Sequence, residues 1–157
     1  MIANMDFDAL TDNELNQLRT IPKLISNPRT QWKNKPGHRQ RNFLAEGERY
    51  QFEIYLRQNT NDERDFSCGL KIIKPDGTAL TLCRYNGGAH AHHEIQYRCH
   101  IHVATSQAIL RGQKPESHAD ETDRYETLEG ALHCLVSDCA ISGLSTMPDE
   151  PDLFGTN

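Results

Sequence analysis

The clearest pattern along the chain is an alternation of apolar and polar side chains in its middle. Residues 50–58 carry an apolar residue at every even position from 50 to 56, a period that predicts a strand with one buried face. The same alternation returns over residues 66–72. After a Lys-Pro-Asp-Gly turn at 74–77, residues 78–85 form a third predicted strand. Together these segments predict an antiparallel meander.

Helical signals lie on both sides of the meander. Thr11 and Glu14 have the spacing of a capping box, and apolar residues at helical intervals follow until Pro22 interrupts them. A short helix is predicted over residues 104–110 and a final helix from residue 127. With a fourth strand over residues 95–103, the expected fold class is α+β. It is an antiparallel β-meander of about four strands, with an N-terminal helix and C-terminal helices packed on one face.

Length and hydropathy favour a single domain over residues 1–157. Its expected parts are a helix plus basic loop (1–45), a core (46–143) and a loosely ordered tail (144–157). No run approaches the ~18 apolar residues of a membrane span, and the N-terminus lacks the charged and apolar regions of a signal peptide. Five cysteines without a CxxC pair suit reduced, buried thiols. A cytoplasmic location without membrane contact is expected.

Charge is distributed unevenly along the chain, whose net charge is −5. Residues 19–41 hold seven Lys or Arg and no acid, whereas the stretch from 116 onward holds ten Asp or Glu and one Arg. The basic stretch could bind phosphate, with its tryptophan stacking on bases. Alternatively, the protein is a non-enzymatic interaction module, an antitoxin or inhibitor, that docks on another protein through this stretch. A plain basic surface loop beside acidic loops is the remaining alternative. The candidate nucleic-acid-binding residues are Arg29, Trp32, Lys33, Lys35, Arg39 and Arg41.

Candidate chemistry concentrates in a histidine-rich stretch. Five of the eight histidines lie within thirteen residues, in a loop half (90–93) and a strand half, where Arg98, His100 and His102 share the polar face. Paired imidazoles can take and give a proton in turn, as RNA cleavage through the 2′-hydroxyl requires. The predicted catalytic residues are His90, His92, His100 and His102. The predicted substrate-binding residues are Arg84, Asn86, Arg98, Arg124 and Tyr125.

Two other interpretations of the histidine stretch stay open. A His-x-His pair on a strand places two imidazoles side by side and can hold a divalent metal, of which zinc is the expected one. In this interpretation the metal ligands are His90, His92, His100 and His102. Alternatively, the histidines only hydrogen-bond their neighbours on a structural or partner-binding face. The expected cofactor is thus none or a divalent metal. The expected partner is RNA, or an antitoxin or other protein.

Several short motifs resemble those of a group of small uncharacterised prokaryotic proteins found among mobile-element and defence-associated genes. The motifs are Arg84-Tyr85-Asn86-Gly87, His90-Ala91-His92, His100-Ile101-His102-Val103-Ala104-Thr105 and Thr122-Asp123-Arg124-Tyr125. The chain also resembles the TumE-like toxins of toxin–antitoxin pairs, through a strand ending in Tyr-Asn-Gly, an HxH and a later Tyr before a leucine-bearing helix. The first resemblance implies no established activity, and the second implies a toxin role. Together with the histidine pair, they lead to the hypothesis of a toxin- or defence-type protein that acts on nucleic acid, by ribonuclease-like cleavage of RNA.

Overall fold

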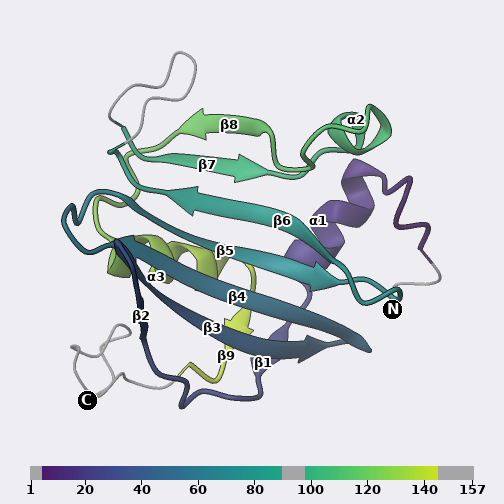
Figure 1. Cartoon of the computed structure of the whole chain (residues 1–157). Helices are drawn as coiled ribbons and strands as arrows, with labels where there is room; N and C mark the ends of the chain where they lie inside the picture. The colour runs from purple at the N-terminus through teal and green to yellow at the C-terminus, as the bar shows by residue number, and fades with distance from the viewer. Residues whose placement is uncertain (1–4, 90–97, 145–157) are drawn as a thin grey trace.

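One wide sheet dominates the computed structural model, which describes residues 5–89 and 98–144 (Figure 1). Nine strands occur in these residues, in the order β8-β7-β6-β5-β4-β3-β1-β9, and β2 pairs with β3 beside β1. The strands are β1 (Lys23–Ile25), β2 (Lys33–Lys35), β3 (His38–Gly47), β4 (Tyr50–Asn59), β5 (Phe66–Ile73), β6 (Ala79–Asn86), β7 (His100–Val103), β8 (His118–Glu121) and β9 (Ile141–Ser142). The β1–β9 pair is parallel and the other pairs are antiparallel, so the sheet is mixed.

The predicted fold class, a meander of about four strands with helices packed on one face, is therefore wrong. The main addition is β3, ten residues that pair with β4 along its whole length. The sequence hides this strand because a cation, Arg41, occupies an inward position beside Phe43 and Ala45 and breaks the apolar alternation. The other additions, β1, β2, β8 and β9, are two to four residues long. Such short strands carry no readable period.

The first helix, α1 (Asp12–Thr20), begins where its capping box predicts. The Glu14 amide donates to Thr11 Oγ1 at 3.0 Å, and the Thr11 amide donates to Glu14 Oε1 at 3.0 Å. The helix ends before Pro22, which cannot continue the hydrogen-bond ladder. Leu15 and Leu18 are fully buried and anchor α1 in the core.

Two further helices follow the strands. Helix α2 (Ser106–Leu110) is a single short turn, and α3 (Leu128–Asp138) starts at the N-cap Thr127. Helix α3 packs against β4, β5 and β6, behind the sheet in the view of Figure 1, and the apolar core lies between them. No helix in the described ranges is long and apolar enough to span a membrane.

A buried lysine ties the ends of α1 and α3 to β1. Lys23 is 1% exposed, and its ammonium donates to the carbonyls of Arg19 (2.8 Å), Ile21 (2.8 Å) and Cys139 (3.0 Å). These carbonyls lie at the C-terminal ends of the helices, where the helix dipole favours a cation. Burial lowers the pKa of Lys23 to about 8. One side chain thus satisfies three acceptors contributed by two helices.

Candidate functional site

Strand register gathers four of the predicted site residues on one face of the sheet. Arg84 lies opposite His102 in the β6–β7 pair, and Asn86 lies opposite His100. The intervening Tyr85 points the other way, because its hydroxyl donates to Asp138 of α3. The four side chains therefore occupy the face turned away from α3, which we call the polar face.

The two histidines of β7 are buried on this face, although the sequence pattern predicts an exposed position. His100 and His102 are 2% and 1% exposed, and their ring centroids lie 4.9 Å apart. Nδ1 of His100 lies 3.2 Å from the Arg98 carbonyl, and Nδ1 of His102 lies 2.8 Å from the Glu116 carbonyl. A carbonyl oxygen only accepts, so both rings carry a proton on Nδ1. In a neutral ring, Nε2 is then the basic nitrogen.

Glu116 closes over the histidines from the segment between α2 and β8. Its main-chain carbonyl accepts from His102, and its carboxylate lies 3.7 Å from Nη1 of Arg84 and 3.8 Å from Nζ of Lys114. The Glu116 side chain is 5% exposed, so its charge is held between these two cations. Sequence reasoning missed Glu116, because only the tertiary contact distinguishes it from the other acids of its segment.

Arg84 and Asn86 each have a buried polar atom without a hydrogen-bond partner among the described residues. These atoms are Nε of Arg84, a donor, and Oδ1 of Asn86, an acceptor. The amide nitrogen of Asn86 is satisfied, since it lies 3.3 Å from Nε2 of His100. An unmet buried polar group costs about 1–3 kcal/mol. The cluster thus offers one donor and one acceptor that a bound molecule could satisfy.

Tyr55 of β4 forms the floor beside Arg84. Its ring lies over Gly69 of β5, where an added Cβ would stand 2.6 Å from the ring carbon Cε2. Lys71 Nζ lies 5.2 Å from the ring centroid. Burial raises the pKa of the Tyr55 hydroxyl. A glycine inside a predicted strand was the available signal, since it marks a close approach.

Three predicted substrate-binding residues lie apart from this cluster. Arg98 pairs with Glu121 at 3.3 Å and stays exposed. Arg124 forms a two-pronged ion pair with Asp138 of α3, at 2.8 and 2.9 Å. The Tyr125 hydroxyl donates to the main-chain carbonyls of β6 and β7. Arg124 and Tyr125 therefore act in the packing of α3 and the strand ends, and the structure does not bring Arg124 to the histidines.

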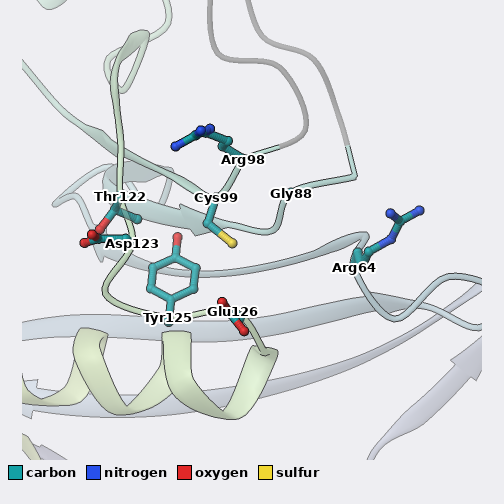
Figure 2. Close-up of a pocket in the computed structure, with 8 residues that line it drawn as sticks. All are labelled: Arg64, Gly88, Arg98, Cys99, Thr122, Asp123, Tyr125 and Glu126. Atoms are coloured by element: carbon teal, nitrogen blue, oxygen red, sulfur yellow. The ribbon is translucent and has the colours of Figure 1, made fainter.

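Arg98 and Tyr125 instead border a pocket of about 420 Å³ at the start of β7. Figure 2 shows Arg98 and Arg64 on opposite rims and the Cys99 sulfur directed inward near the Tyr125 ring. The lining residues are Arg64, Gly88, Arg98, Cys99, Thr122, Asp123, Tyr125 and Glu126. Burial raises the pKa of the Cys99 thiol, with Glu126 contributing in the same direction, so this thiol is no activated nucleophile.

The predicted nucleic-acid-binding segment is divided by the structure. The Trp32 ring stacks under the Arg39 guanidinium at 4.0 Å. Arg41 is 3% exposed and lies over Phe43 on the α3 side of the sheet. Lys33 and Lys35 are exposed on β2 and pair in register with polar-face positions of β3, and Arg29 is exposed in the preceding loop.

His90 and His92 lie outside the described residues, so their predicted place in the site stays a prediction. Within residues 5–89 and 98–144, no group of three or more His, Cys, Asp or Glu could hold a metal ion. The metal-binding interpretation likewise stays a prediction. Comparison of the chain with protein-family models, curated proteins and solved structures finds no match. Function is therefore argued from the site itself.

Proposed function

We propose that the polar-face cluster binds RNA and cleaves it by acid–base catalysis. The observation that carries the proposal is the pair of unmet buried atoms, Arg84 Nε and Asn86 Oδ1, beside two imidazoles. The guanidinium of Arg84 suits a phosphate oxygen, because charge-assisted hydrogen bonds to phosphate are strong. The Asn86 carbonyl suits a hydroxyl or amine donor of the same ligand.

The hydrogen bonds of the histidines suit proton transfer. The Glu116 carbonyl holds the His102 ring with Nε2 as its basic nitrogen. That nitrogen would take the proton of the 2′-hydroxyl as the 2′-oxygen attacks phosphorus. His100 in its protonated form would give a proton to the departing 5′-oxygen, leaving a 2′,3′-cyclic phosphate and a 5′-hydroxyl.

The test is cleavage of the dinucleotide UpU, with formation of the cyclic phosphate followed by chromatography. We expect His102→Gln to lower the rate by about 10²–10⁴-fold. Arg84→Met should raise KM and lower kcat, and 2′-deoxy UpU should not react. Arg49→Met, which removes a cation in the β3–β4 turn, is the matched control. Wild-type rates in a folded His102→Gln protein would refute the proposal. The predicted toxin or defence role stays a prediction.

A further inference from the structure

The polar face carries two adjacent rows of side chains that cross the sheet at right angles to its strands. The register of neighbouring strands defines them, because cross-strand partners share a face. The first row runs Lys33, Gln40, Arg57, Ser67, Asn86 and His100, and the second runs Asn42, Tyr55, Gly69, Arg84 and His102. The predicted cluster of β6 and β7 is thus one end of a longer polar track that reaches β2.

From β2 to β7, the charged side chains at the strand positions of this track are all basic. Between β2 and β7 no Asp or Glu occupies a strand position in either row, although the whole chain has 22 acidic and 17 basic residues. On β8, Glu121 follows His100 in the first row, and its carboxylate pairs with Arg98 at 3.3 Å. Lys33 and Arg57 are exposed and make no ion pair with the described residues. The nearest acids are paired: Glu116 lies against Arg84, and Glu53 lies 4.0 Å from Lys71 in the next row. The track is a cationic stripe on an acidic protein.

The spacing of the cations fits the backbone of a nucleic-acid strand. Neighbouring strands lie about 4.8 Å apart, so the five intervals from β2 to β7 span roughly 24 Å. The cations Lys33, Arg57 and Arg84 come from β2, β4 and β6, which puts them roughly 10 Å apart. A track of this length matches a site of about four nucleotides, the lower end for single-strand-binding domains.

The depth of the cluster favours a single strand over a duplex. Arg84 Nε and Asn86 Oδ1 are buried, whereas the side chains of Lys33 and Arg57 are exposed at the surface. A duplex holds its phosphates on a stiff cylinder and its base edges inside, whereas an unpaired nucleotide can turn inward. The strand would then run over the exposed cations and place one nucleotide at the histidines.

We infer that single-stranded RNA crosses the polar face from the β2 lysine to the histidine pair, perpendicular to the strands. The inference rests on the proposed function for what happens at the histidine end. The cations of β2 and β4 contribute affinity for strands longer than a dinucleotide, and the β6–β7 cluster handles the nucleotide that is cleaved.

The experiment measures binding of fluorescein-labelled octauridine by anisotropy over a range of salt concentrations, with UpU cleavage as a second readout. Lys33→Met and Arg57→Met should each lower the log–log salt slope by about 0.7, the value for one single-strand phosphate contact. Affinity for octauridine should fall several-fold, and UpU cleavage should not change. Arg49→Met should leave both readouts at wild-type values. A self-complementary RNA duplex of equal length should bind more weakly.

The outcomes separate this inference from the proposed function. Wild-type salt slopes in both variants, absence of octauridine binding, or equal affinity for the duplex would each overturn the track. Loss of slope without any UpU cleavage would leave the track standing and reject the acid–base function. Cleavage of UpU with unaltered salt slopes would leave the acid–base function standing and reject the track. Because Lys33 and Arg57 are exposed, replacing them should not disturb the fold, and the measured differences report on binding.

Discussion

Replacing Lys23 by methionine tests whether this buried ammonium stabilises the fold. Methionine keeps the apolar stem and much of the volume but removes all three hydrogen bonds to the carbonyls of α1 and α3. Hydrogen bonds from charged donors contribute about 1.5–3 kcal/mol each, and losing one partner leaves the other unmet. The bond to the Cys139 carbonyl is buried, whereas the bonds to the Arg19 and Ile21 carbonyls are part-buried and contribute less when lost. We therefore expect a loss of about 3 kcal/mol in the free energy of unfolding at neutral pH.

The pH dependence of the difference gives the sharper test. The pKa of Lys23 falls from 10.5 to about 8 on folding. Between these values the unfolded chain binds more protons than the folded one, so wild-type stability rises with pH across that window. The contribution of Lys23 at about pH 9.5 is about 2 kcal/mol larger than at neutral pH. A methionine has no such group, so the gap between the two proteins should widen as pH rises.

The assay is urea denaturation followed by circular dichroism under reducing conditions, at neutral pH and at about pH 9.5. Lys35→Met, at an exposed position of β2, is the control and should change the midpoint little. A loss below about 1 kcal/mol for Lys23→Met would refute the role of the three hydrogen bonds. A gap that narrows at the higher pH would refute the lowered pKa.

Three more predictions concern the core and the strand ends. Leu132→Ala should cost about 2–5 kcal/mol in urea denaturation, because Leu132 is fully buried in α3; a loss below about 1 kcal/mol would contradict its place in the core. Tyr125→Phe should cost about 1–2 kcal/mol through loss of the one hydroxyl proton shared between the Asn86 and His100 carbonyls, and an unchanged urea midpoint would show this hydrogen bond to be dispensable. The Cys83 and Cys139 sulfurs lie 3.8 Å apart, so diamide should join them in a disulfide that peptide mapping detects. Closing a loop of 56 residues should add about 4 kcal/mol of stability, and Cys83→Ser should abolish the gain.

The parts of the fold that could be read from the sequence are those where one face is buried by apolar residues alone. The predicted strands at 50–58, 66–72 and 78–85 correspond to β4, β5 and β6 within about a residue at each end. The capping signature likewise locates the start of α1. Local pattern suffices there, because burial follows the period of the element.

The remaining strands depend on cations that are buried by tertiary contacts. Arg41 and Lys23 are 3% and 1% exposed, yet a lysine or arginine in sequence is expected at the surface. Their burial relies on acceptors from distant segments, such as Pro28 and Thr30 for Arg41. A pattern of residue types cannot supply that pairing, so β1 and most of β3 fall within the stretch predicted as a helix plus basic loop (1–45).

The candidate site was predictable only in part for a similar reason. The period of β7 places His100 and His102 on one face, and the register of β6 adds Arg84. Whether that face is open or covered depends on the segment after α2, whose Glu116 returns over the histidines. The sequence of β7 itself does not indicate that a distant loop buries its histidines.

The lateral edges of the sheet have a consequence for how copies of this protein behave at high concentration. Edge strands expose unpaired main-chain groups that can add strands from other chains and start aggregation. Here β8 has four residues, with exposed charge at Asp120 and Glu121, and β9 at the other end has two. Two copies of the β8 edge would bring like charges together at Asp120, and the two-residue β9 edge offers too few hydrogen bonds to hold a second chain. The sheet therefore ends at β8 and β9 and does not readily add strands from another molecule. The protein can expose its polar face without assembling into a fibre.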